Sequence, residues 1–135
     1  MTSKQHKILL QGIDDMQTLH AFFQACQRDM QLSAQNLVEL RIIADEVVSN
    51  IFRYNQAPIE VILLVGKKGK RVNLSVEDSG KPFNLLEATE PAIDFPLEAR
   101  ELGGLGIRLV RSLSDQIRYR YERDKNRLTI IKEVH

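Results

Sequence analysis

The sequence is poor in cysteine, and its one cysteine sits in an apolar context. Cys26 is the only cysteine among 135 residues, so no disulfide can form within the chain. This excludes the disulfide-stapled folds of small secreted proteins and fits a reducing, cytoplasmic setting. Because Phe22, Phe23 and Ala25 flank it, we expect Cys26 to be a small buried hydrophobe and not a reactive thiol.

Net charge and long apolar runs are lacking too. The 19 lysine and arginine residues are balanced by 18 aspartate and glutamate residues, so no net field favours a nucleic acid or an anionic membrane. The longest apolar run, residues 61–65, is far shorter than the roughly 18 residues that a membrane span requires. The first residues carry no signal-peptide core. We therefore expect a cytoplasmic protein that binds neither nucleic acid nor membrane directly.

Hydrophobic periodicity in the first half predicts a strand and two helices. Residues 5–11 have a short apolar centre and should form a strand. Apolar residues recur at steps of three and four over 16–30, so a helix should start near Asp14. Ser33 is then expected to cap a second helix, whose apolar stripe runs over 37–51.

The second half predicts two hairpins separated by a long loop. Residues 59–80 should form a hairpin that turns near 67–70, and residues 116–134 a second one that turns near 124–126. Between them, 81–102 carries three prolines and no clear period, which predicts a loop with room for one short helix. We expect one α+β domain over 1–135, a two-layer sandwich of a mostly antiparallel mixed sheet with helices on one face.

The second predicted helix carries a carboxylate and an amide one turn apart. Glu46 and Asn50 lie on the same side of a helix, beside the apolar stripe, and can act on one ligand. The amide oxygen of Asn50 suits Mg²⁺, and Glu46 can act as a general base near a metal-bound phosphate. Taken alone, the pair is better explained as an ordinary solvated helix flank with a weak side-chain contact.

Two further groups suit a phosphorylated, flat ligand. Asp78 ends a predicted strand and can accept a hydrogen bond from an amino group, while Gly80 lets a ligand approach the backbone. Three glycines at 103, 104 and 106 precede a predicted helix, whose free N–H groups can bind an anion. Taken singly, an ordinary turn and a flexible hinge are the competing explanations.

In this order the three groups resemble a known family. The stretch EVVSN at 46–50 resembles its N box, DSG at 78–80 its first glycine box, and GGLGI at 103–107 its second. The family is the GHKL ATPase and kinase superfamily. The forms EDSGKPFN and GGLGIRLVRSLSDQIRYRY are similar to its branch of anti-sigma-factor serine/threonine kinases in bacterial partner switching. The resemblance covers nearly the whole chain and implies the Bergerat, or histidine-kinase-like ATPase, fold.

The resemblance implies a site for ATP and Mg²⁺. Asn50 would bind Mg²⁺, Asp78 with Gly80 would receive adenine, and residues 81–102 would close as a lid. The phosphates would be held by the backbone of Gly103, Gly104, Leu105 and Gly106. Pro82 stands where many relatives have glycine, and we expect it to stiffen the start of the lid.

Three more roles follow from the same resemblance. Glu46 would be the base that takes the proton of a substrate serine. Arg53 would touch phosphate, although a solvated surface arginine fits the sequence equally well. Thr129, on a late strand, would help to fix adenine, although a β-branched residue in a strand has its own explanation.

The implied function is an ATP-dependent serine/threonine kinase that regulates transcription as an anti-sigma factor. It would phosphorylate a small antagonist, an anti-anti-sigma protein of the STAS type, and can also hold a sigma factor. The alternative is a nucleotide-gated binding regulator with little or no kinase activity. Both functions are compatible with a homodimer. A histidine kinase would need a phosphoacceptor on a dimerising helix, which none of His6, His20 and His135 provides. We also expect no ATPase of the gyrase or chaperone type, because the chain leaves no room for a transducer domain.

Overall fold

The computed structural model describes residues 4–55, 57–87 and 106–134, and its elements follow the predicted order. In chain order they are β1 (Lys4–Leu10), the 3₁₀ turn η1 (Ile13–Asp15), α1 (Met16–Met30), α2 (Ala34–Tyr54), β2 (Val61–Lys68), β3 (Arg71–Asp78), the 3₁₀ turn η2 (Leu85–Glu87), a helix at 106–113, β4 (Gln116–Glu122) and β5 (Lys125–Glu133).

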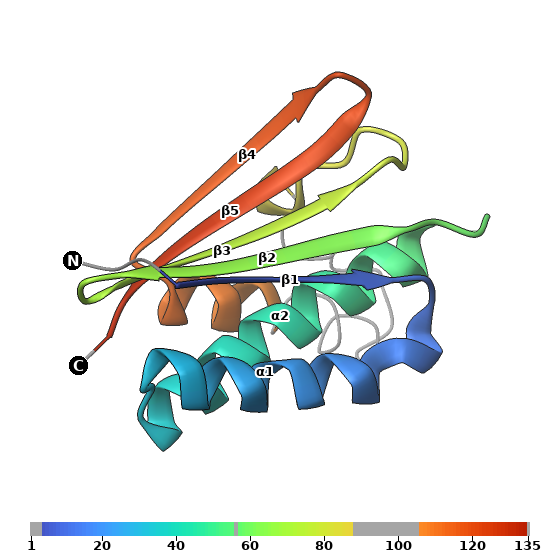
Figure 1. Ribbon diagram of the computed structural model, residues 1–135. Coiled ribbons are helices and arrows are strands. Elements are labelled where there is room, and N and C mark those ends of the chain that lie inside the picture. Colours follow the sequence, from blue (N-terminus) through green and yellow to red (C-terminus); the bar gives the residue numbers. More distant parts are fainter. Residues whose placement is uncertain (1–3, 56, 88–105, 135) are drawn as a thin grey trace.

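The five strands form one sheet in the order β1-β2-β3-β5-β4, and the helices cover one of its faces (Figure 1). The predicted α+β sandwich is therefore confirmed. All four pairings among the described strands are antiparallel, so no parallel pair makes this sheet mixed. The second hairpin turns at Arg123 and Asp124, earlier than the sequence predicts, and both residues have a left-handed backbone, with φ of 55° and 62°. Two left-handed residues give a turn whose twist matches that of the strands.

The core lies between the sheet and the helices. Alternate residues of β2, β3 and β5 point into it, including Leu63, Leu74 and Ile130, each with no exposed surface. From the helix layer, α1 contributes Phe23 and Cys26, which are also fully buried. Burial raises the pKa of the Cys26 thiol to about 11, with the negative charge of Asp29 adding to the effect. The prediction of an inert, buried cysteine is confirmed, since a thiol with this pKa is protonated at neutral pH.

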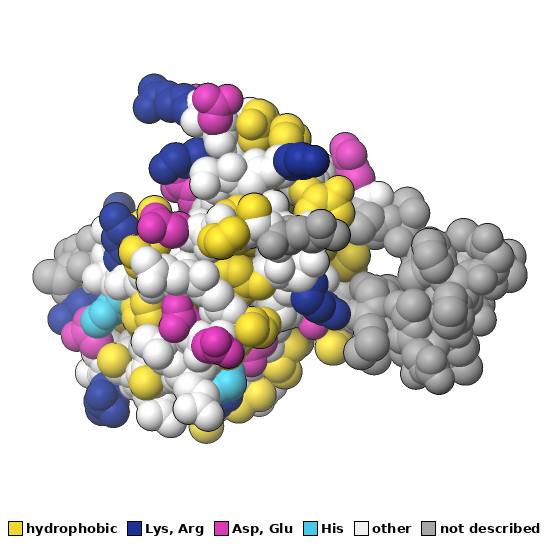
Figure 2. All heavy atoms as spheres, turned by 90° about the vertical axis from the view of Figure 1, so that its right-hand side faces the viewer, with side chains coloured by type: hydrophobic (Ala, Val, Ile, Leu, Met, Phe, Trp, Pro, Cys, Tyr) yellow, Lys and Arg dark blue, Asp and Glu magenta, His cyan; other side chains and the backbone are white. Residues whose placement is uncertain are grey.

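Figure 2 shows the side of the molecule that faces right in Figure 1, where α2 ends. Hydrophobic side chains lie there in small groups, with acidic and basic side chains between them. No helix in the described part of the chain is both long enough and apolar enough to cross a membrane.

The predicted cap of α2 is present. The Ser33 hydroxyl accepts a hydrogen bond from the backbone N–H of Asn36 at 3.0 Å and donates one to the Asn36 side chain at 2.8 Å. Seven residues of α2 are buried, so the helix both begins at a defined residue and presents a defined face to the sheet.

We expect Ser33→Ala to lower the free energy of unfolding by about 1–2 kcal/mol. The variant loses two hydrogen bonds at the start of α2, one with the backbone N–H of Asn36 and one with its side chain. Ser112→Ala is the matched control, since Ser112 is exposed and bonds only to a carbonyl of its own helix. Chemical denaturation of both variants should show a loss for the first and a change within about 0.5 kcal/mol for the second. Equal effects would contradict the capping role.

Candidate functional site

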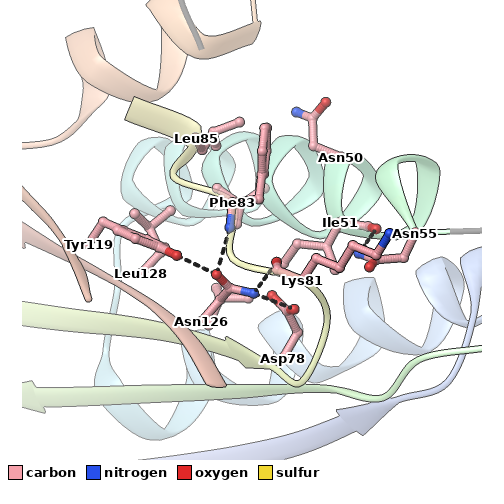
Figure 3. Close-up of a pocket in the computed structure, with 12 residues that line it drawn as sticks. Asn50, Ile51, Asn55, Asp78, Lys81, Phe83, Leu85, Tyr119, Asn126 and Leu128 are labelled. Atoms are coloured by element: carbon pink, nitrogen blue, oxygen red, sulfur yellow. Dashed lines mark hydrogen bonds between the residues drawn. The ribbon is translucent and has the colours of Figure 1, made fainter. Parts of the chain in front are cut away.

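A pocket lies between α2 and the ends of β3 and β5 (Figure 3). Both layers and the loop that follows β3 contribute its lining: Val47, Asn50, Ile51, Asn55, Val76, Asp78, Lys81, Phe83, Leu85, Tyr119, Asn126 and Leu128. The cavity has a volume of about 30 Å³, small beside the roughly 300–1,000 Å³ of typical ligand pockets.

Asp78 is the polar floor of the pocket. As the last residue of β3 it continues the inward alternation of Leu74 and Val76, and it is 6% exposed. Its Oδ1 accepts hydrogen bonds from the Gly80 N–H at 2.9 Å and from Asn126 Nδ2 at 3.1 Å. Among the described residues Oδ2 has no partner and remains available as an acceptor. Burial raises the pKa of the Asp78 carboxyl, and these two hydrogen bonds oppose the rise.

Asn126 connects every polar group at this end of the pocket, as the dashed lines in Figure 3 show. Its Nδ2 also donates to the carbonyls of Gly80 and Lys81 at 3.3 and 2.9 Å. Its Oδ1 accepts from the Phe83 N–H at 2.9 Å and from the Tyr119 hydroxyl. Asn126 is not among the site residues predicted from the sequence. The alternation of the strand could have identified it, because Asn126 lies two and four residues before Leu128 and Ile130 and so shares their buried face.

Thr129 does not reach this pocket. Neighbouring residues of β5 point to opposite faces of the sheet, and Leu128 and Ile130 point towards the helices. Thr129 therefore points away from them, in register with Ser75 and Arg118 on the neighbouring strands. The side chain of β5 that the structure brings to Asp78 is Asn126.

Gly80 is close-packed by the chain itself. A Cβ at this position would lie 2.8 Å from Ile59 Cδ1 and 3.0 Å from Asn55 Cγ, distances at which carbon atoms overlap. Asn55 is held there because its Nδ2 donates to the Ile51 carbonyl at 2.8 Å. The absence of a side chain at Gly80 thus lets the turn after β3 pack against the end of α2.

On α2 the structure brings together Glu46, Asn50 and Arg53. Asn50 Nδ2 donates to Glu46 Oε1 at 3.0 Å and to the Glu46 carbonyl at 2.7 Å. Arg53 donates to Asn50 Oδ1 at 3.0 Å, and the same nitrogen lies 3.8 Å from Glu46 Oε1. These contacts orient the amide, with its nitrogen towards Glu46 and its oxygen towards a cationic group.

Of the second glycine group the structure describes only its last member. Gly103, Gly104 and Leu105 lie outside the described residues. Gly106 is buried and helical, and a Cβ added there would meet the Glu46 side chain. The structure thus brings one glycine of this group to the carboxylate of α2.

The start of the predicted lid is attached to the pocket. The Phe83 ring stacks on Tyr54 at the end of α2, with ring centroids 4.1 Å apart. Further on, Arg111 donates to the Leu86 carbonyl at 2.7 Å, which ties η2 to the helix at 106–113. The rest of the expected lid, residues 88–102, lies outside the described residues.

We expect Asn126→Ala to lower the free energy of unfolding by about 2 kcal/mol, because the buried Asp78 carboxylate and partly buried groups on the loop after β3 and on β4 lose hydrogen bonds. It should also weaken nucleotide binding, since Asp78 loses the group that orients it. Thr129→Val is the control from the same strand and should change both quantities little. Denaturation and nucleotide titration of the two variants test this, and a loss of binding in Thr129→Val alone would contradict it.

Comparison with known proteins agrees with this geometry. A relative among characterised proteins is the serine/threonine-protein kinase BtrW of Bordetella bronchiseptica strain RB50. It is 27% identical over 101 residues, which cover 73% of this chain and 71% of BtrW. A model of the histidine kinase-like ATPase domain matches residues 12–132, a span that contains α1, α2, the pocket and strands β2 to β5 except the last residue of β5. The chain therefore belongs to the family of histidine kinase-like ATPase domains.

Proposed function

We propose that this protein is an ATP-dependent serine/threonine kinase of a partner-switching system. The observation that carries the proposal is the pairing of the Glu46 carboxylate with the Asn50 amide on α2, where Asn50 also lines the pocket above Asp78. The family supplies ATP binding, and the relative BtrW is named a serine/threonine-protein kinase. The substrate would be a serine of a small antagonist, an anti-anti-sigma protein of the STAS type, and a sigma factor would be a second partner.

The pocket residues fit the two ends of ATP. Asp78 offers Oδ2 as an acceptor for the amino group of adenine, between apolar side chains such as Val76 and Leu128. Asn50 offers Oδ1, which already faces the positive charge of Arg53. The described residues contain no cluster of three or more His, Cys, Asp or Glu side chains suited to a metal. Proteins usually hold Mg²⁺ through few side chains and the phosphates, so Asn50 could serve as a protein ligand.

In this proposal each residue of α2 has a separate task. Asn50 would hold Mg²⁺, which would neutralise phosphate charge. Arg53, with half of its side chain exposed, would leave Asn50 Oδ1 to reach a phosphate oxygen. Glu46 takes the proton of the substrate serine while the serine oxygen forms a bond to the γ-phosphorus of ATP. The bond between that phosphorus and the bridging oxygen breaks, and ADP leaves.

The second candidate function is a nucleotide-gated binding regulator. It is favoured by the low exposure of Glu46, whose side chain is only 24% exposed. Incubation of the wild type with γ-labelled ATP and an antagonist encoded beside it separates the two. Label on an antagonist serine supports the kinase, whereas nucleotide-dependent binding without label supports the regulator.

Two variants of α2 should fail in different ways. Glu46→Gln keeps the shape and loses the basicity, so ATP should still bind while transfer falls by about 10²–10⁴-fold. Asn50→Ala removes a metal ligand, so Mg²⁺-dependent binding and transfer should both fall. Single-turnover transfer and nucleotide titration of each variant measure this. Transfer at the wild-type rate in Glu46→Gln would refute the role of Glu46 as the base. If both variants bind ATP normally and lose transfer only in proportion to their loss of thermal stability, the pair is structural.

Asp78→Asn should weaken ATP binding without harming the fold. The raised pKa of Asp78 means that the folded protein binds its proton more tightly than the unfolded chain does. The charged carboxylate therefore destabilises the fold, and this cost disappears as pH falls through the folded-state pKa. The neutral amide should leave stability at pH 7 unchanged or higher, with less gain on acidification.

ATP affinity should fall by about 1.5–3 kcal/mol in the same variant, because a charged acceptor is lost. Calorimetric titration at pH 7, beside thermal unfolding from pH 7 down to pH 4, measures both effects. Unchanged affinity in a folded Asp78→Asn protein would refute the adenine role.

A further inference from the structure

The helix at 106–113 approaches α2 so closely at Gly106 that no side chain fits there. A Cβ on Gly106 would lie 2.7 Å from Cγ of Glu46 and would overlap the carboxylate. The nearest atoms are all in the Glu46 side chain, so the contact joins one glycine to one carboxylate. The position is buried, so a methyl group could not turn towards solvent.

The Glu46 carboxylate cannot move away without losing its partners. It accepts a hydrogen bond from Asn50 Nδ2 at 3.0 Å and lies 3.8 Å from the Arg53 guanidinium. The other end of the Asn50 amide is held by Arg53 at 3.0 Å. A methyl at 106 would push Glu46 out of this chain of contacts.

We propose that Gly106 is a positioning residue for Glu46. Its missing side chain gives the carboxylate its place between the helix at 106–113 and the Asn50 amide. The inference rests on the proposed role of Glu46 as the base. This positioning role differs from the one that the sequence resemblance implies for Gly106. There the glycine lets the backbone approach a phosphate, and the Glu46 side chain plays no part.

The two tasks predict different couplings. If Gly106 makes room for Glu46, the effect of adding a methyl depends on whether the Glu46 side chain is there. If Gly106 only lets the backbone approach a phosphate, the added methyl should change the stability of the nucleotide-free protein equally with and without the Glu46 side chain. A double-mutant cycle measures this difference directly.

The cycle compares the wild type, Gly106→Ala, Glu46→Ala and the double variant by thermal unfolding in the absence of nucleotide. Glu46→Ala should fold, because Asn50 Nδ2 keeps the carbonyl of residue 46 as an acceptor at 2.7 Å. In that background Gly106→Ala should leave Tm unchanged or raise it slightly, since the overlap is gone and alanine favours a helix over glycine. In the wild type the same change should lower Tm. Equal shifts in both backgrounds would overturn the proposal.

Transfer and binding provide the second readout. Gly106→Ala should reduce single-turnover transfer about 10²-fold or more while ATP affinity changes less than about 3-fold, since the base is displaced and the adenine end is untouched. A parallel loss of ATP affinity and transfer would overturn the proposal in favour of the phosphate role. Gly12→Ala is the control, because Gly12 has an extended backbone and nothing within 4 Å of an added Cβ, and it should behave as wild type.

The outcome also separates this inference from the proposed function. Coupling in Tm together with no transfer by the wild type would support the placement of Glu46 by Gly106 and refute the kinase. Transfer by the wild type without coupling in Tm would support the kinase and refute the positioning role of Gly106.

Discussion

The side-chain amide of Asn126 is the interaction on which the pocket depends. It is almost fully buried and joins β5 to the end of β3, to the loop after β3 and, through Tyr119, to β4. Buried polar groups cost free energy unless they are paired, and the buried Asn126 amide pairs with five polar groups, of which the Asp78 carboxylate is itself buried. The apolar sheet thus ends in a polar network that holds Asp78 in place and fixes where the loop at 81–87 begins.

The second half of the candidate site lies on α2, and its position depends on which side of that helix faces the sheet. Ser33 sets where the helix begins, and the buried stripe sets which side faces the sheet. Glu46, Asn50 and Arg53 follow one another at steps of four and three, so they share one side of the helix and form a chain of contacts. The helix at 106–113 closes that side at Gly106. The contacts among Glu46, Asn50 and Arg53 on α2 and the polar network of Asp78 and Asn126 on the sheet are thereby held by independent elements.

Most of the fold follows from local patterns in the sequence. Period-two alternation located both hairpins, and steps of three and four located α1 and α2, because burial on one face selects these periods. The N-cap of α2 was predictable from Ser33 alone, since serine suits that position. The pairing of β3 with β5, which builds the pocket, joins residues about 50 positions apart and leaves no local signal.

The site was less predictable than the fold, for reasons of geometry. Asp78, Glu46 and Asn50 were identified because carboxylates and amides stand out at a strand end and on a helix flank. Thr129 differs from Asn126 by strand phase, and a resemblance between sequences does not reveal which of them faces Asp78. The tight contacts at Gly80 and Gly106 depend on side chains far away in sequence, so composition alone suggests flexibility where the structure shows close packing.

The central claim is that the Asn126 network forms the adenine end of a nucleotide site. Nuclear magnetic resonance of ¹⁵N-labelled protein tests it most directly, because the Asn126 side-chain amide and the Phe83 backbone amide give separate signals. The account predicts that titration with ATP and Mg²⁺ shifts both signals strongly and leaves those of Lys4 to Lys7 on β1 unchanged. ATP binding that shifts signals elsewhere while those of Asn126 and Phe83 stay in place would contradict it.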